Sequence, residues 1–353
     1  MFSIEFYNLN VAEAKFEFLG ESLTFSNLYY EPVLNGVGSC TFNINILDEY
    51  ADQKYLRRMS TVVVIKEDNT CVWFGPIADI SGSYSDLDGY ITVTAYTYLY
   101  YFKFRNTEKS QIYSQVEQSA IMWDLIDKSQ DKTNGTLLIT QGLNPTSMLR
   151  DRTYETYEIS EALINLTNVI NGPDFSFEPV FDSDNRLSSI TFNCYYPTKG
   201  TLREELGKLE MGVNVSSVNW VTISDLYNTV TIEGAGTGVP LIYTDSDSVC
   251  QLAYTRIEGY EKSSDISEWD TLEKHGAKLL NNNKVEGYRL NLTIMPSSDL
   301  ITSALSVGDT MICNIIAGNY LSLTNRQAEI NKIPTTVNNE GVKTINLEVE
   351  IYG

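Results

Sequence analysis

The alternation of apolar and polar side chains near both ends of the chain most constrains its fold. Phe42, Ile44 and Ile46 alternate with polar residues, and the segments 288–294 and 345–351 repeat this period of two. Successive side chains of a β-strand point to opposite faces of the sheet, so a period of two marks a strand with one buried face. The pattern therefore predicts β structure at both ends of the chain.

The first hundred residues contain five or six such segments, separated by turn residues. The apolar run Val62–Ile65 and the segment Cys71–Phe74 predict a hairpin, which we expect Gly75-Pro76 to end. Asp88-Gly89 predicts a tight turn before an alternating strand over residues 90–99. Short strands joined by turns that contain glycine are typical of a small β-barrel or sandwich.

The pattern becomes helical after Arg105. Apolar residues recur every three or four positions between Ser110 and Lys128, which predicts a helix there. A second helix is expected to begin near Ser160 and to end at Asn171-Gly172-Pro173. The apolar face of this second helix would comprise Ala162, Leu163, Leu166 and Ile170. Strands are expected over 175–181 and 187–194, so this part predicts a small α+β domain.

β structure returns after residue 200. The strand candidates are 227–233, 288–294, 310–316 and 344–352. One helix, about 267–283, interrupts them, with Ser267 as the expected N-cap and Asp270 near the positive end of the helix dipole. Its apolar face would comprise Trp269, Leu272, Gly276 and Leu279.

Residues 73–96 and 326–352 share one layout, in which a strand leads through a polar turn into an alternating strand. We interpret them as parts of two copies of one module. The predicted fold class is therefore α+β, mainly β, with two similar β-barrel modules at 1–105 and 201–353. A small α+β domain at 106–200 separates the two modules, and a helix is inserted in the second barrel region.

The charge of the chain excludes some classes of partner. Its 353 residues carry a formal charge of −21, which argues against proteins that read nucleic-acid grooves or dock on anionic membranes. There is no apolar run of about 18 residues, and Met1–Phe6 has no basic region before an apolar stretch. We therefore expect no membrane anchor and no signal peptide.

The sequence has few groups suited to catalysis or metal binding. His275 is the only histidine, and the five cysteines form no CxxC pair. Gly234–Gly238 lacks the third glycine of a dinucleotide fingerprint and the Lys-Ser/Thr of a P-loop. The Asp-x-Asp pairs at 86/88, 182/184 and 245/247 do not continue into a calcium loop and are interpreted as turns. We predict no catalytic, cofactor-binding or metal-ligating residue, no cofactor and no enzyme activity.

A dense aromatic segment runs from Tyr96 to Phe104. Tyrosine-rich faces occur at protein interfaces, where a rigid ring supplies contact area at low entropic cost. Sugar-binding sites and a barrel strand packed on both faces are the alternatives, and the sequence does not choose among the three.

The order of several segments resembles the hub proteins at the distal end of phage tail tubes, including the N-terminal part of tail-associated lysins. The segments that carry the resemblance are Gly36–Phe42, Val62–Ile65, Trp73–Ile77, Ile91–Tyr96, Leu226–Gly234, Thr271-Leu272 and Val307–Thr310. Leu226–Gly234 resembles the strand that opens the second barrel. The resemblance extends over nearly the whole chain.

The resemblance implies a structural role and a set of partners. Three copies would form a ring of six near-equivalent tail-tube-like modules, joining a sixfold tail tube to a threefold tip. The implied partners are further copies of this chain, a tail tube or distal tail protein, and a tip, spike or fibre protein, with DNA passing through the bore. The implied location is the tail tip or baseplate of a virion, after synthesis in the cytoplasm of the bacterial host.

The chain ends at Gly353, whereas tail-associated lysins of this family often continue into a peptidase or fibre extension. This difference favours a bare hub. A carbohydrate-binding or glycoside-cleaving β protein and a peripheral receptor-binding baseplate component are the alternatives.

Overall fold

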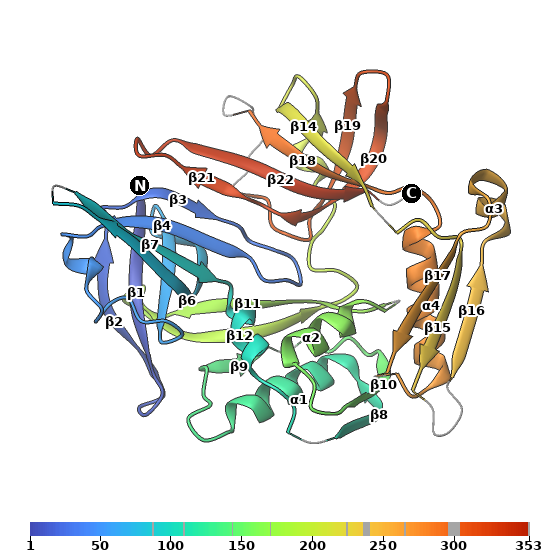
Figure 1. Ribbon diagram of the computed structural model, residues 1–353, viewed down its shortest axis with the longest axis horizontal. Helices are drawn as coiled ribbons and strands as arrows, with labels where there is room; N and C mark the ends of the chain where they lie inside the picture. The colour runs from blue at the N-terminus through green and yellow to red at the C-terminus, as the bar shows by residue number, and fades with distance from the viewer. Residues whose placement is uncertain are drawn as a thin grey trace.

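The strands predicted at the two ends of the chain belong to one continuous sheet of fourteen strands. The computed structural model describes residues 1–86, 88–108, 110–142, 144–169, 171–223, 225–235, 241–264, 266–295 and 304–351. Figure 1 shows one half of the sheet, in blue, beside the N-terminus and the other half, in red, near the C-terminus. Three smaller sheets and the helices lie outside this sheet.

The first module contains the N-terminal half of the large sheet, in the order β3-β4-β7-β6-β5-β1-β2. Its strands are β1 (Phe2–Asn10), β2 (Lys15–Ser22), β3 (Ser26–Tyr30), β4 (Ser39–Asn45), β5 (Thr61–Glu67), β6 (Thr70–Tyr84) and β7 (Gly89–Tyr96), with the short helix η1 (Glu49–Ala51). The predicted Asp88-Gly89 turn is confirmed, because the N–H of Ser85 donates to the carbonyl of Asp88 between β6 and β7.

The buried run in β5 shows that this sheet is covered on both faces. Val63 and Ile65 pack in the core of the first module, whereas Val62 and Val64 pack in a second core that the module shares with the following helices. A strand buried on both faces has a continuous apolar sequence instead of an alternating one. The four consecutive apolar residues are therefore explained by the position of β5 between two cores.

Gly75-Pro76 does not end a strand as predicted. β6 continues through both residues and changes its partner there: Pro76 is the last residue paired with β5, and Ile77 is the first paired with β7. Proline has no N–H to donate, so it suits a position where one ladder stops. A Cβ on Gly75 would lie 1.8 Å from the carbonyl oxygen of Tyr96, so only glycine fits at this corner.

The second module repeats the strand order of the first. Its strands are β13 (Lys208–Glu210), β14 (Val215–Thr222), β18 (Tyr288–Ile294), β19 (Thr310–Ala317), β20 (Leu321–Lys332), β21 (Thr335–Val337) and β22 (Lys343–Ile351), after the short helix η3 (Glu204–Leu206). The order β14-β18-β22-β20-β19-β13 matches β3-β4-β7-β6-β5-β1, strand for strand and in the same chain order. Two details differ: β13 pairs with β19 in parallel whereas β1 pairs with β5 antiparallel, and β2 has no counterpart among the described strands of the second module.

The two modules are joined through β21. This strand pairs with β22 on one side and with β3 of the first module on the other, both antiparallel. The predicted fold class, mainly β with two similar modules and an α+β unit between them in sequence, is confirmed. The domain boundaries at residues 105 and 200 stay a proposal.

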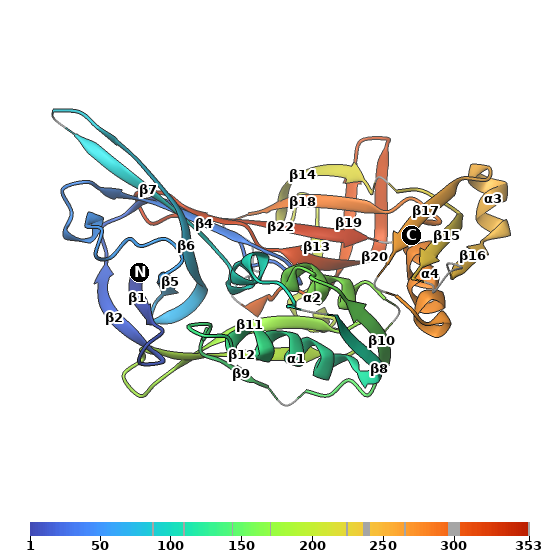
Figure 2. The same cartoon turned by 60° about the horizontal axis from the view of Figure 1, so that its bottom comes forward.

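The α+β unit shares a core with the first module, and in Figure 2 its helices lie below the second module. It contains β8 (Gln111–Glu117), α1 (Gln118–Gln130), β9 (Ile139–Gln141), β10 (Leu149–Tyr154), α2 (Ile159–Thr167), β11 (Asp174–Phe181) and β12 (Leu187–Tyr195). The predicted helix over 110–128 is wrong in its first part, since residues 111–117 form a strand paired with β10. The predicted strands over 175–181 and 187–194 are confirmed as a hairpin. The predicted second helix is confirmed over Ile159–Thr167, but it ends there, before the predicted Asn171-Gly172-Pro173, and Ile170 lies outside the described residues.

Arg186 of the α+β unit contacts a buried ion pair of the first module. Glu5 accepts from Lys66 at 2.9 Å, from Arg186 at 2.8 Å and from the hydroxyl of Tyr7 at 2.6 Å. The side chains of Glu5 and Lys66 are almost fully buried, so the charge of Lys66 depends on Glu5 for compensation.

The segment between β14 and β18 is a separate small unit, not a lone helix. Its elements are β15 (Thr229–Gly234), β16 (Ile242–Ser246), α3 (Ser248–Tyr254), β17 (Glu258–Ser263) and α4 (Trp269–Asn283). The expectation that Leu226–Gly234 contains the strand that opens the second barrel is therefore wrong, because β15 pairs only with β16 and β17 among the described strands. The cap of α4 is Glu268 instead of the predicted Ser267.

The apolar face of α4 covers this three-stranded sheet. Leu272 and Leu280 pack there with Val230 and Ile232, whereas Trp269, predicted on the same face, is largely exposed. Figure 1 shows the unit, in orange, at the far end of the molecule from the N-terminus. Within the described residues, no helix is long and apolar enough to cross a bilayer.

Candidate functional site

A polar crevice of about 840 Å³ lies where the second module meets the α+β unit and helix α4. Charged side chains from five elements face it: Asp174 of β11, Lys278 of α4, Arg289 of β18, Glu329 and Lys332 of β20, and Glu348 and Glu350 of β22. Asparagines contribute much of the remaining lining. The crevice therefore brings charged and amide side chains of three units together.

Most charges of the crevice are paired. The guanidinium of Arg289 donates to Glu350 at 2.8 and 2.5 Å, and Lys332 lies 3.2 Å from Glu348. Glu329 differs: its pKa is raised to about 7, mainly by burial and also by the nearby carboxylates of Asp174 and Glu350, against the effect of Lys278. Burial lowers the pKa of the Lys278 ammonium. The crevice thus holds one carboxyl group that titrates near neutral pH.

This crevice has few of the side chains that are typical of a binding or catalytic centre. Its lining includes no aromatic ring among the described residues, and no group of three or more His, Cys, Asp or Glu in the described ranges could hold a metal ion. We interpret it as the polar contact zone between units.

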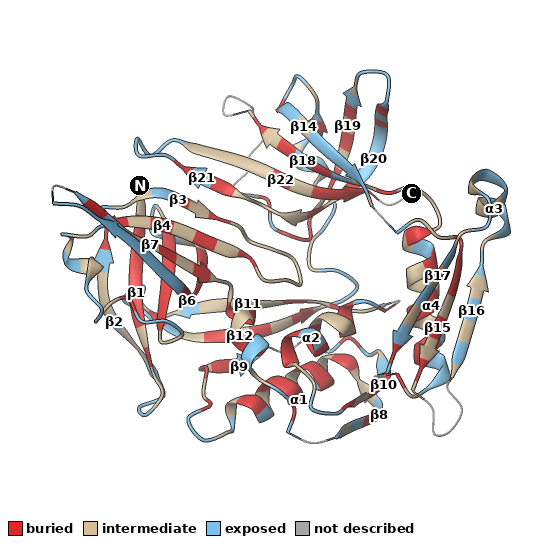
Figure 3. Cartoon of the chain, viewed as in Figure 1, coloured by how far each residue is buried: buried red, intermediate tan, exposed pale blue. Residues whose placement is uncertain are grey.

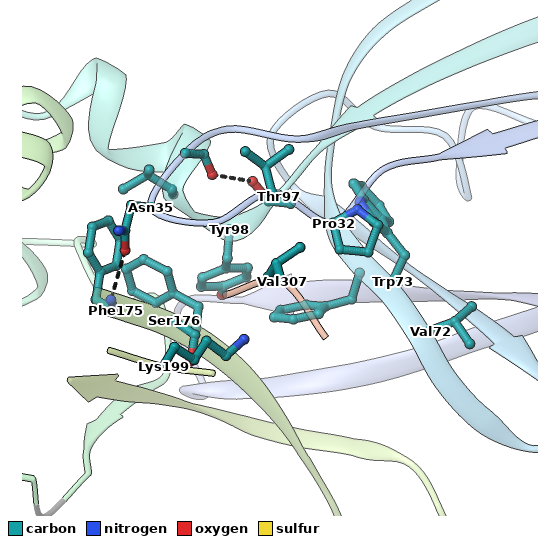
Figure 4. Close-up of a pocket in the computed structure, with 15 residues that line it drawn as sticks. Pro32, Asn35, Val72, Trp73, Thr97, Tyr98, Phe175, Ser176, Lys199 and Val307 are labelled. Atoms are coloured by element: carbon teal, nitrogen blue, oxygen red, sulfur yellow. Dashed lines mark hydrogen bonds between the residues drawn. The ribbon is translucent and has the colours of Figure 1, made fainter. Parts of the chain in front are cut away.

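A smaller, apolar pocket lies between the first module and β11 (Figure 4). Its volume is about 150 Å³, below the roughly 300–1,000 Å³ of most small-molecule sites. Trp73, Tyr98, Phe175 and Val307 form walls, and the Asn35 amide oxygen accepts from the N–H of Phe175 at 2.9 Å. We interpret this space as a gap in the packing between units.

Some of the exposed apolar side chains lie at or beside strands that have an unpaired edge. Tyr84 and Tyr90 are exposed on the β6–β7 hairpin, and Val221 on β14. Trp220 of β14 stacks on Tyr320, with ring centroids 6.3 Å apart, next to the β19–β20 turn. Figure 2 shows the β6–β7 hairpin extending well beyond the rest of the first module. Exposed apolar groups at open sheet edges are typical of surfaces that pair with another chain.

His275 is a buried residue of helix α4. Its Nδ1 lies 2.8 Å from the carbonyl oxygen of Asn168, and its Nε2 lies 2.7 Å from Glu261 Oε1. Both ring nitrogens therefore have partners that connect α4 to the α+β unit and to β17.

Asp88 and Asp182 lie in turns, as the sequence predicted, whereas Asp245 lies in β16 and Asp247 caps a helix, so the turn prediction for that pair is wrong. Asp182 accepts from the N–H groups of Asp184 and Arg186, and Asp88 accepts from the N–H of Gly89. Asp247 caps α3 and lies 3.2 Å from Lys284. Of the glycine-rich stretch 234–238, residues 236–238 lie outside the described residues.

The aromatic segment is mostly an internal contact. Residues 98–104 form the short helix η2 (Tyr98–Phe104) instead of the predicted end of a strand. Tyr98 donates its hydroxyl to the carbonyl of Leu137 at 2.6 Å, and both it and Phe102 are buried in the core shared with the α+β unit. The segment therefore joins two units of one chain, and the sequence missed the unpaired strand edges described above.

Structures of tail proteins resemble this chain over its whole length. The tail protein from Neisseria meningitidis MC58 is 13% identical, with a TM-score of 0.60, and 99% of this chain and 96% of that chain are covered. The 43 kDa tail protein of prophage MuSo2 from Shewanella oneidensis is 11% identical, with a TM-score of 0.56 and 98% coverage of both chains.

A third similar structure comes from a secretion machine. The E. coli c3393 protein, a component of the type VI secretion system described as structurally similar to T4 phage tail proteins gp27 and gp5, is 10% identical. Its TM-score is 0.51, and 95% of this chain and 75% of that chain are covered. No family model and no curated protein sequence matches the chain. The likeness shows that this chain has the fold of these tail proteins, as its resemblance to the hub family implies.

Proposed function

We propose that this chain is a structural, non-enzymatic component of the tail tip or baseplate of a phage or a tail-like particle. The observation that carries the proposal is the repeat of one strand order in two modules of a single sheet. The full-length likeness to tail proteins supports the same role. The protein would be part of the virion, assembled after synthesis in the host bacterial cytoplasm.

The finer proposal is a ring of three copies. Three chains with two equivalent modules each would present six modules to a sixfold tail tube and three copies of the remaining units to a threefold tip or spike. The partners would then be further copies of this chain, a tube or distal tail protein on one side, and a tip, spike or fibre protein on the other.

The charge of the chain is consistent with a bore for DNA. Each chain carries −21, and a negative bore would not retain a passing polyanion as a positive one would. The carbohydrate alternative has little support, because the rings it would need, such as Tyr98 and Phe102, are buried in the chain's own core.

The trimeric ring is tested by light scattering of the purified chain together with negative-stain images of the same fraction. We expect a mass of three times 39.8 kDa and a ring with a central hole. A mass of one chain at every concentration would contradict the trimer, and a compact particle without a hole would contradict the bore.

A further inference from the structure

The repeat leaves one strand edge covered in the first module and the equivalent edge open in the second. The two modules align on a ladder of directly paired residues. In the first module the ladder is Ile77–Ala95–Cys40–Tyr30. In the second module it is Ile330–Val349–Leu290–Trp220. The first three residues of both ladders are fully buried, which fixes the alignment, and β3 therefore corresponds to β14.

Only the last residue of each ladder differs in environment. Tyr30 of β3 is 5% exposed, whereas Trp220 of β14 is 36% exposed. The cause is the neighbouring strand, since β21 pairs with β3 and no described strand other than β18 pairs with β14. Figure 3 shows β14 mainly in the colour of exposed residues. The second module therefore has an open position where the first module receives a strand.

The first module has the strand that would fill this position. This strand is the outer segment of β6, Ser81–Tyr84, which pairs with the start of β7 so that Tyr84 lies opposite Gly89. In the same way β21 pairs with the start of β22, where Val337 lies opposite Lys343. Val337 is 4% exposed because β3 covers it, whereas Tyr84 is 66% exposed. All residues from Asp79 to Tyr84 are exposed, so this length of β6 has a free edge.

We propose that the outer segment of β6 in one copy adds as an antiparallel strand to β14 of a second copy. The pairing repeats between chains the contact that β21 and β3 make within one chain. The observed pairs Thr335–Tyr30, Thr336–Tyr29 and Val337–Leu28 then give Gly82–Trp220, Ser83–Asn219 and Tyr84–Val218 between copies. Strand addition satisfies the backbone groups of both open edges and brings Tyr84 against Val218.

This contact is head-to-tail, because it joins two different surfaces of the same chain. Around the ring, the β21–β3 contact within each chain would alternate with the β6–β14 contact between neighbouring chains. Such an arrangement closes into a ring when the successive rotations from module to module add up to a full turn. The inference rests on the proposed function for that closure and adds to it the strands and the register that join neighbouring copies.

The register is tested by mixing two singly substituted chains that carry tags of different mass, Ser83→Cys in one and Asn219→Cys in the other. Directly opposite residues of an antiparallel pair have Cβ atoms about 4.5–5.5 Å apart, close enough for mild oxidation to join them. Both positions are exposed, so neither substitution removes a buried contact. The unsubstituted chain controls for the five native cysteines, of which Cys40, Cys194 and Cys313 are buried.

A matched control uses Ser81→Cys with Ser217→Cys, two exposed serines on the same two strands. In the proposed register these two positions are not opposite each other but are offset by four residues, or about 13 Å along the strands. We expect the Ser83–Asn219 mixture to give the mixed-tag cross-link at least about tenfold more than this control. Equal cross-linking in a sample whose scattering mass is that of an oligomer overturns the register and leaves the proposed ring standing. A sample that stays monomeric and uncross-linked overturns the pairing and the ring together.

Discussion

Glu329 makes the stability of the protein depend on pH in a direction that the structure predicts. Its pKa is raised from 4.5 to about 7, because the crevice buries it beside Asp174 and Glu350 with only partial compensation by Lys278. Each pKa unit corresponds to about 1.4 kcal/mol, so ionising Glu329 in the folded chain costs up to about 3 kcal/mol. The exposed part of the carboxyl group reduces this figure.

The sign of the effect follows from proton binding. Between pH 4.5 and 7 the unfolded chain has already released the proton of Glu329 while the folded chain retains it. The contribution of this group to stability is therefore complete below pH 4.5 and is lost as the pH rises through 7. Glu329→Gln keeps the shape of the side chain and removes the ionisation, so it should remove this loss.

The assay is urea unfolding of the natural chain and the Glu329→Gln variant at pH 5, 6, 7 and 8. The measured quantity is the free energy of unfolding of the variant minus that of the natural chain. We expect this difference to increase by about 2–3 kcal/mol from pH 5 to pH 8. Glu340→Gln, in an exposed turn, controls for the loss of one negative charge. A difference that stays constant from pH 5 to 8, or that shrinks, would refute the buried-carboxyl argument.

Three further substitutions test contacts between and within the units by chemical denaturation. Glu5→Gln should cost about 3–5 kcal/mol, because it leaves the buried ammonium of Lys66 without its carboxylate; a loss below 1 kcal/mol would contradict the buried pair. Gly75→Ala should destabilise the first module by more than 1 kcal/mol, because its Cβ would lie 1.8 Å from the carbonyl oxygen of Tyr96; an unchanged unfolding midpoint would exclude this close approach. Tyr98→Phe should cost about 1–3 kcal/mol by leaving a buried carbonyl unpaired, and a neutral result would mean that water reaches that carbonyl.

The regular strands were predictable because their apolar and polar side chains alternate, which indicates one buried face. Residues 288–294 alternate between core and solvent along β18, and the predicted bounds agree with the strand. The prediction failed at 111–117, where Ile112 and Val116 are four residues apart. A spacing of four fits one face of a helix and also one face of a strand, so periodicity cannot separate the two.

The aromatic segment was misjudged for a related reason. Tyr96, Tyr98 and Tyr100 have the even spacing of a strand, but the chain forms a 3₁₀ helix with a period of three from Tyr98 onward. Tyr98 and Tyr101 are three residues apart and are both buried. Which period the chain follows depends on the core under the segment, and the local sequence does not contain that information.

The open strand edges were out of reach of the sequence because pairing partners are far apart in the chain. Leu28 pairs with Val337, more than 300 residues away, and no local pattern indicates this contact. For the same reason Gly75-Pro76 looked like the end of a strand: the change of partner from β5 to β7 exists only in the assembled sheet.

The claim at the centre of this account is that each chain contributes two equivalent modules to a ring. A cryo-EM map of the purified oligomer tests it most directly. We predict a threefold axis with six modules at the same radius, and continuous sheet density from β6 of one copy to β14 of the next. A map in which the two modules lie at different radii, or in which β14 faces solvent in every copy, would contradict the account.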